Sequence, residues 1–189
     1  MLMSSIYNFL DRPDVREIFG RLGRVYAVGG AVRDSVLGRE PADIDFATPI
    51  LPEEAQRLLP GSKAGKFGNV EWRGHTITTF RRDTYHGSRF PRVEFVGSIE
   101  EDAMRRDFTM NALYMSADGT IDDPLGGLAD IDASIVRFIG DPEKSVRQDF
   151  QRAERYFRFV EELGFDNIDA ASFAAAKAAE CGMKGALKK

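Results

Sequence analysis

Residues 25–48, VYAVGGAVRDSVLGREPADIDFAT, contain in close succession the signals for a strand, a glycine pair, a short helix and a second strand. The apolar run RVYAVGG predicts a buried strand that Gly29 and Gly30 end. GAVRDSVLG predicts a helix that ends at Gly38, and ADIDFAT predicts the next strand because polar and apolar residues alternate. The fold must therefore place the N-terminus of a helix beside the edge of a sheet.

Asp43 and Asp45 alternate with Ile44 and Phe46 in this second strand. On a strand, the apolar pair is buried on one face and both carboxylates lie on the other. Adjacent anions repel each other, and Mg²⁺ prefers oxygen ligands and usually keeps several waters, so the pair suits Mg²⁺ bound together with substrate phosphates. The alternative is a solvated strand edge, the commoner origin of a D-x-D pattern taken alone.

Gly29 and Gly30 allow a phosphate to approach backbone N–H groups at the start of a helix, where the helix dipole is positive. Arg33 follows one turn later as a charged hydrogen-bond donor. Asp34 is assigned a structural role, either orienting Arg33 or capping the helix. A nucleoside triphosphate could bridge these glycines and the carboxylate pair.

Other patterns predict an α+β fold with a mixed, mostly antiparallel sheet. Residues 4–20 predict a helix that Pro13 kinks or divides. Three β-rich runs occupy residues 67–97, with a hairpin turn at Arg73-Gly74.

A second group of elements follows this β-rich region. Ser98 and Glu101 predict a capping box that opens a helix through EEDAMRRDFTMNAL. Two short strands then meet at an Asp118-Gly119 turn, and IVRFIG closes the sheet. Within the β-rich region, residues 81–92 (RRDTYHGSRFPR) predict a loop before the third run.

This loop carries four arginines, Tyr85 and Phe90. Arg89 and Arg92 are assigned either to RNA backbone contacts or to solvated charge. His86 is interpreted as an exposed loop residue and not as a general base.

A change in composition after Asp141-Pro142 places a boundary there and divides the chain into residues 1–140 and 141–189. EKSVRQDFQRAERYFRFVEELGF predicts one long amphipathic helix, and DAASFAAAKAAECG predicts an Ala-rich helix. One stripe of the long helix repeats every three residues: Asp149, Arg152, Arg155 and Arg158. Four others are expected to pack inward: Phe150, Ala153, Phe157 and Val160.

Composition limits the classes of function. At 189 residues and 43% hydrophobic, the chain can form one sizeable core. No apolar run suits a membrane span and the N-terminus reaches charge too early for a signal peptide, so we expect a cytoplasmic protein. Cys181 is the only cysteine and His75 and His86 are the only histidines, so any metal must be held by carboxylates. With a net charge of −4, nucleic acid would bind only at local clusters of Arg and Lys.

Four motifs occur in a fixed order: GGAVRDSVLGREPADIDFAT, EEDAMRRDFTMNALYM, GTIDDPLGGLADIDASIVRFIG and DFQRAERYFRFVEELGF. Together they resemble the class II tRNA nucleotidyltransferases and the bacterial poly(A) polymerases over residues from about 24 to 170. The resemblance implies a polymerase-β-like nucleotidyltransferase head at 1–140 and the start of a helical, base-recognising neck at 141–189.

The resemblance also implies roles for particular residues. The glycine pair and Arg33 would bind the triphosphate, and Asp43 and Asp45 would be the catalytic residues that hold two Mg²⁺ ions. Three residues would select ribose: Arg106, Asp107 and Asn111. The alternative for Asp107 is a helix cap within a salt-bridge network.

The stripe Asp149, Arg152, Arg155 and Arg158 would be a protein template for the base. An aspartate accepts from the amino group of C or A while an arginine donates to the adjacent ring nitrogen, and G and U present the opposite order. The alternative is a solvated basic face paired with Glu154, Glu161 and Glu162.

Two positions depart from the family pattern. Thr76 stands where the family has a strand glutamate, so Glu71 or Asp83 is a candidate to replace it. Gln148 stands where a glutamate precedes the template aspartate, which removes a charge that would orient Arg152.

The implied activity is the addition of C, A or both from CTP and ATP to an RNA 3′ end, with tRNA the leading substrate. The alternatives are a poly(A) polymerase and a non-catalytic nucleotide- or RNA-binding subunit. A partner protein or a second copy of the chain is expected to supply further RNA-binding surface.

Overall fold

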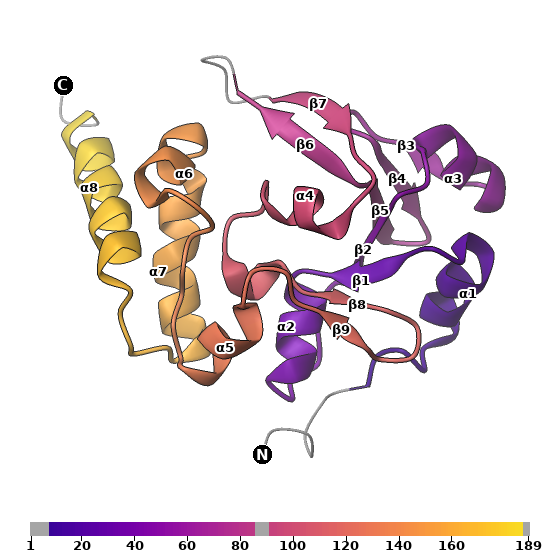
Figure 1. Cartoon of the computed structure of the whole chain (residues 1–189), viewed down its shortest axis with the longest axis horizontal. Coiled ribbons are helices and arrows are strands. Elements are labelled where there is room, and N and C mark those ends of the chain that lie inside the picture. The colour runs from indigo at the N-terminus through magenta and orange to yellow at the C-terminus, as the bar shows by residue number, and fades with distance from the viewer. Residues whose placement is uncertain (1–7, 86–90, 187–189) are drawn as a thin grey trace.

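A seven-stranded sheet in the order β3-β4-β5-β2-β1-β8-β9 lies at the centre of the computed structural model, which describes residues 8–85 and 91–186 (Figure 1). Its strands are β1 (Tyr26–Val28), β2 (Asp45–Thr48), β3 (Lys63–Ala64), β4 (Asn69–Trp72), β5 (His75–Thr79), β8 (Tyr114–Met115) and β9 (Ile121–Asp122). All neighbouring strands are antiparallel except β2 and β5, which are parallel. The predicted α+β class and mixed, mostly antiparallel sheet are confirmed.

The predicted turn between β4 and β5 is also confirmed. Trp72 pairs with His75 across it, and its two central residues, Arg73 and Gly74, have φ values of 48° and 86°. Two successive left-handed residues are the signature of the tight hairpin turn whose twist matches that of the strands.

Some helices lie around the sheet, and others form a separate layer beside it (Figure 1). They are α1 (Pro13–Leu22), α2 (Gly30–Val36), α3 (Pro52–Leu58), α4 (Ile99–Ala103), α5 (Gly127–Asp132), α6 (Pro142–Gln148), α7 (Gln151–Leu163) and α8 (Ala170–Ala186), with a 3₁₀ turn, η1 (Thr109–Asn111). Pro13 begins α1 instead of kinking a longer helix, because proline fits the first helical position, where no N–H is needed. The earlier residues 4–7 of the predicted helix lie outside the described range.

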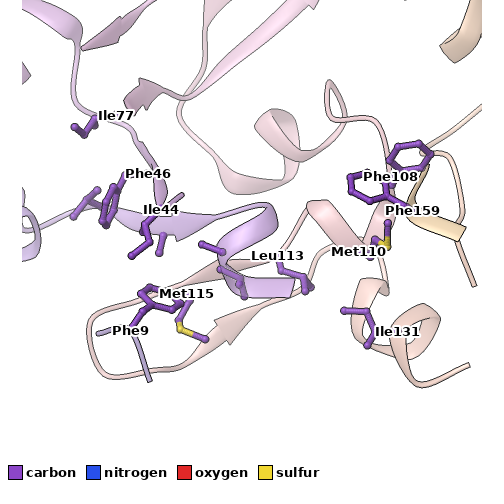
Figure 2. Packing of buried hydrophobic residues seen from close by; sticks show 14 of the residues in the cluster. Phe9, Ile44, Phe46, Ile77, Phe108, Met110, Leu113, Met115, Ile131 and Phe159 are labelled. Atoms are coloured by element: carbon purple, nitrogen blue, oxygen red, sulfur yellow. The ribbon is translucent and has the colours of Figure 1, made fainter. Parts of the chain in front are cut away.

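The two faces of the sheet differ in what covers them. One face contributes Phe46, Ile77 and Met115 to the main core (Figure 2). Helices α1, α2 and α3 pack buried residues into the same core. The opposite face contributes Ala47 and Tyr114 to a smaller cluster. Asp45 is on this second face, two residues before Ala47, so the carboxylates lie away from the main core.

Aromatic side chains join helix α7 to the rest of the fold. Phe108 stacks on Phe138 with ring centroids 4.8 Å apart, and Tyr156 stacks on Phe138 at 5.6 Å. Phe159 contacts Phe108 edge to face at 5.6 Å, and these two rings lie together in Figure 2. The hydrophobic core is therefore continuous across the boundary predicted near residue 141.

The long helix predicted after Ser98 is wrong beyond its first turn. Ser98 caps α4 by accepting from the backbone N–H of Glu101, as predicted, but α4 ends at Ala103. Phe108 is extended, with φ −124° and ψ 147°, and bridges Phe138. The reason is that Phe108 must reach the core, and its N–H donates to Asp107 Oδ1 at 2.9 Å instead of continuing a helix.

The single helix predicted for residues 143–165 is also wrong, because it is divided at Asp149. This residue is extended (φ −149°, ψ 104°), and its carboxylate accepts from the N–H of Gln151 at 3.1 Å. This local hydrogen bond caps the start of α7 and stabilises the break. Phe150, predicted to pack inward, is 54% exposed.

Two further corrections concern strands. Part of the predicted loop 81–92 is strand β6 (Arg81–Thr84), which pairs with β7 (Arg92–Phe95) in a second sheet. His86, Arg89 and Phe90 lie outside the described residues. IVRFIG does not close the sheet; it makes isolated bridges at Ile135 and Phe138.

No helix in the described part of the chain is both long enough and apolar enough to cross a membrane.

Helix α5 packs so closely on η1 that only glycine fits at their contact. A Cβ added to Gly127 would lie 2.3 Å from the carbonyl oxygen of Thr109. Because backbone must move, we expect Gly127→Ala to lower the free energy of unfolding by about 3 kcal/mol. Gly20, on the exposed side of α1, has nothing within 4 Å of an added Cβ, so Gly20→Ala should raise it by about 0.5–1 kcal/mol. Urea unfolding of both variants tests this, and equal effects would contradict the packing argument.

Candidate active site

The carboxylates of Asp43 and Asp45 lie at the start of β2, both exposed, while Ile44 and Phe46 between and after them are buried. The predicted alternation is therefore present, although β2 begins only at Asp45. Both side chains leave the sheet on the face away from the main core. The pair is accessible to a cation and to a substrate.

Thr76 lies beside Asp45 on the neighbouring strand β5, where its hydroxyl partly offsets the rise in the pKa of Asp45. Glu71 is opposite Thr76 on β4, one strand further from Asp45. Asp83 pairs instead with Arg81, at 2.9 Å. Within residues 8–85 and 91–186, no cluster of three His, Cys, Asp or Glu side chains is placed to hold a metal.

The environment of Asp45 makes its carboxyl a weaker acid than usual. Desolvation by the surrounding protein, followed by the negative charge of Asp43, raises the pKa of Asp45. The charge of Arg106 and the hydrogen bond from Thr76 act in the opposite direction without cancelling the effect. A divalent cation between the two carboxylates would relieve this repulsion.

The backbone of this segment is held from the core side by a buried histidine. His75 Nδ1 lies 3.0 Å from the carbonyl oxygen of Ile44, and Nε2 lies 2.9 Å from Asp14 Oδ2. The ring packs edge to face on Phe46 at 5.6 Å. Ile44 lies between the two aspartates, so these contacts fix the peptide that carries them.

A polar cavity of about 370 Å³ opens between the head of α2, the end of α4, strand β6 and helix α7. Its lining residues are Gly29, Gly30, Arg81, Asp83, Tyr85, Arg105, Arg106, Asp107, Asn111, Arg152 and Arg155. Five of these are arginines and two are aspartates, so the lining is strongly basic. A cavity of this size and charge suits a phosphorylated small molecule.

Asp102 holds two of these arginines in place. It is 0% exposed, and it accepts from Arg105 Nε at 2.8 Å, Arg106 Nη2 at 3.0 Å and the Tyr114 hydroxyl at 2.7 Å. It also accepts from the backbone N–H of Arg81 at 3.1 Å. Burial opposes ionisation, but the charges of Arg106 and Arg105 outweigh it and lower the pKa of Asp102. Burial raises the pKa of Tyr114, which therefore stays a neutral donor.

A second network crosses the cavity from α2 to α7. Arg33 Nη1 donates to Asn111 Oδ1 at 2.8 Å, and Asn111 Nδ2 donates to Asp107 Oδ1 at 3.2 Å. Arg155 then joins Asp107 Oδ2 to Asp149 Oδ2, at 3.1 Å in each case. Asp107 and Asn111 therefore meet as predicted, although through a turn and not on one helical face.

Arg152 is almost fully buried at the cavity wall, with 7% of its surface exposed. Nη1 donates to Ser145 Oγ at 2.7 Å and Nη2 donates to the carbonyl oxygen of Arg105 at 3.1 Å. The guanidinium is thereby held in one orientation.

Two predicted residues lie apart from the others. Arg33 is buried behind Asn111, pairs with Asp34 at 2.8 Å and lies over the Phe159 ring at 4.7 Å. The structural role assigned to Asp34 is thus confirmed. Arg158 is outside the cavity lining and lies near Glu162 at 3.8 Å, as the solvated-face alternative expects.

The sequence reasoning missed several wall residues. Arg81 and Asp83 of β6 and Tyr85 directly after it line the cavity, and their spacing of two residues was the available signal for one face of a strand. Of these, the sequence pointed to Asp83 alone, and only as a replacement carboxylate. Arg105 belongs to the RRD motif, but only its neighbour Arg106 was selected. Nothing local indicates that Asp102 is buried beneath them.

Comparison with known proteins places these features in context. Residues 25–137 match the family described as the poly A polymerase head domain. A curated relative, the CCA-adding enzyme of Geobacillus stearothermophilus, is 48% identical over 148 residues, which cover 74% of this chain and 37% of that protein. The chain thus spans well under half the length of this curated relative.

Solved structures agree with this match. The crystal structure of the Bacillus stearothermophilus CCA-adding enzyme in complex with CTP is similar with a TM-score of 0.74 and 41% identity, over 87% of this chain and 43% of that one. The Thermotoga maritima CCA-adding enzyme complexed with tRNA has a TM-score of 0.69 and 27% identity, over 90% of this chain and 43% of that one.

Asp102→Asn tests the buried carboxylate. Removing one charge from a buried, hydrogen-bonded ion cluster should lower the free energy of unfolding by about 3 kcal/mol at pH 7. Because the pKa of Asp102 is lowered in the fold, its contribution is present at neutral pH and is lost as the pH falls through that lowered pKa. Urea unfolding at several pH values measures both effects. Glu94→Gln, which removes an exposed partner of Arg82, should cost less than about 1 kcal/mol, and a similar cost for Asp102→Asn would contradict the role of Asp102.

Asp45→Asn should raise the free energy of unfolding of the metal-free protein, whereas Asp102→Asn should lower it. It removes the repulsion from Asp43, so we expect the free energy of unfolding at pH 7 to rise by about 0.5 kcal/mol, as for a partly screened charge interaction. When a carboxyl has a raised pKa in the fold, its ionisation at higher pH destabilises the folded protein. The gain from Asp45→Asn should therefore disappear below about pH 4, where Asp45 is protonated in both the folded and the unfolded state. Thermal unfolding with a chelator present is the measurement. A destabilised variant would show that Asp45 is held by favourable contacts that outweigh the repulsion.

Proposed function

The chain belongs to the poly A polymerase head domain family, and from this premise we propose that it adds C and A nucleotides from CTP and ATP to the 3′ end of an RNA. The observation that carries the proposal is a basic cavity whose wall includes Arg106, a residue close enough to Asp45 to influence its carboxylate. Such a site combines cation ligands with donors for a triphosphate.

The carboxylate pair fits a divalent cation on its own chemistry. Asp43 and Asp45 are exposed oxygen donors on one face, and the nearby charge of Arg106 does not cancel their mutual repulsion. When bound there, Mg²⁺ would activate the attacking 3′-hydroxyl and stabilise the leaving pyrophosphate. Substrate phosphates and water would complete its coordination.

The protein's own residues would bind and orient the nucleotide. Arg106 is fixed by Asp102 and Tyr114 beside Gly29, where a guanidinium can neutralise phosphate charge without reorganisation. Asp107 and Asn111 offer an acceptor and a donor to the ribose hydroxyls. The reaction is in-line attack of the RNA 3′-oxygen on the α-phosphorus, with pyrophosphate as the leaving group.

Base selection is assigned to Asp149 and Arg152 across the α6–α7 break. A carboxylate accepts from the exocyclic amino group of C or A, and a guanidinium donates to the adjacent ring nitrogen. The Asp149 carboxylate forms an ion pair with Arg155. With the boundary predicted after Asp141-Pro142, residues 1–140 would form a nucleotidyltransferase head and residues 141–189 a base-recognising neck.

We favour addition of CCA to tRNA over poly(A) synthesis. The similar curated relative is named a CCA-adding enzyme, and the similar structures contain CTP or tRNA. A non-catalytic binding subunit is less favoured, because both carboxylates are retained and exposed. That a partner protein or a second copy supplies further RNA-binding surface stays a prediction.

The test is incorporation of labelled CTP and ATP, offered separately and together with Mg²⁺, into tRNA lacking its CCA end. We expect incorporation by the wild type and a loss of at least about 10³-fold in Asp43→Ala/Asp45→Ala, because the cation ligands are removed. Circular dichroism should show that the double variant is folded. Incorporation that survives the double substitution would overturn the carboxylate assignment, and nucleotide binding without incorporation would favour the non-catalytic subunit.

A further inference from the structure

Ser145 lies on α6 with its side chain directed at Arg152 of α7. It is 3% exposed, and its hydroxyl oxygen is 2.7 Å from Arg152 Nη1. A serine seven residues before an arginine would not contact it in this way along one continuous helix. The contact exists because the chain breaks at Asp149 and α7 folds back against α6.

The remaining polar contact of Arg152 is equally rigid. Its Nη2 donates to the backbone carbonyl of Arg105, a residue that Asp102 fixes through Nε. The guanidinium is therefore clamped between one side-chain hydroxyl and one backbone oxygen. Both acceptors are neutral, so the positive charge of Arg152 remains available to a ligand.

Gln148 takes no part in this clamp. It lines a small cavity of about 130 Å³ together with Ser145, Arg152 and Arg106. Gln148 brings no charge to orient Arg152, as the sequence indicated, and the side-chain hydrogen bond that orients Arg152 comes from Ser145.

We propose that Ser145 is a positioning residue for base selection: its buried hydroxyl sets the orientation in which Arg152 donates to the ring nitrogen of the incoming base. The inference rests on the proposed function and names the residue that supports its specificity. Without the hydroxyl, Nη1 of a buried guanidinium loses its acceptor and the group can turn to other partners. A guanidinium in another orientation no longer distinguishes a base whose ring nitrogen accepts a hydrogen bond from a base whose ring N–H donates one.

The experiment compares Ser145→Ala with Ser145→Thr in the intact chain. Calorimetric titration with CTP, ATP, UTP and GTP in the presence of Mg²⁺ gives the discrimination ratio, and inorganic tripolyphosphate reports on the phosphate-binding part alone. We expect Ser145→Ala to reduce the ratio of CTP to UTP affinity about tenfold, with tripolyphosphate affinity unchanged. Ser145→Thr should keep the wild-type ratio, because it retains the hydroxyl and the adjacent small cavity accepts a methyl group.

Ser172→Ala is the matched control. Ser172 is 0% exposed, lies on α8 and accepts from the Phe138 N–H at 3.1 Å, remote from the cavity lining. Its loss should lower stability without changing the ratio. Wild-type discrimination in Ser145→Ala would overturn the role of Ser145 while leaving the proposed function intact. A wild-type protein that binds all four nucleotides equally would contradict base selection itself, and this role with it.

Discussion

A fully buried carboxylate, Asp102, organises the walls of the candidate site. Two guanidinium groups, a phenol and a backbone N–H converge on it, and a charge without water is tolerated only with such partners. Arg105 and Arg106 are consequently presented to the cavity in fixed positions. The same contacts end α4 and direct the following residues into the core.

The two faces of the sheet have different roles: one packs into the main core, and the other carries the candidate catalytic carboxylates. Phe46 and Ile77 pack into the main core, whereas Asp45 emerges on the opposite face. Because strand residues alternate, a single short strand provides both. One consequence is that desolvation, followed by repulsion from Asp43, raises the pKa of Asp45.

The helical layer is connected to this sheet by aromatic packing and by one arginine. Arg155 joins Asp107, from the turn after α4, to Asp149, at the start of α7. The ribose-binding and base-reading parts of the proposed function are therefore mechanically linked. Ser145 and Arg152 belong to the same arrangement, because Ser145 and the backbone of Arg105 hold Arg152 at the cavity wall.

The local features were determined by the sequence alone, since each depends on neighbouring residues. The alternation around Asp45, the glycine pair before α2 and the hairpin at Arg73-Gly74 follow from strand periodicity and backbone freedom. The order of the four motifs predicted the family, which the match over residues 25–137 confirmed. The basic character of the site was also evident from the arginines in those motifs.

Tertiary structure alone decided where helices end and which charges meet. Helical periodicity continues past Ala103 and through Asp149, but burial of Phe108 and the local hydrogen bond of Asp149 interrupt it. Arg33, for example, donates to Asn111, 78 residues away in the chain. Partners so distant are invisible to local patterns, because a buried charge selects whichever acceptor the folded chain brings within hydrogen-bonding distance.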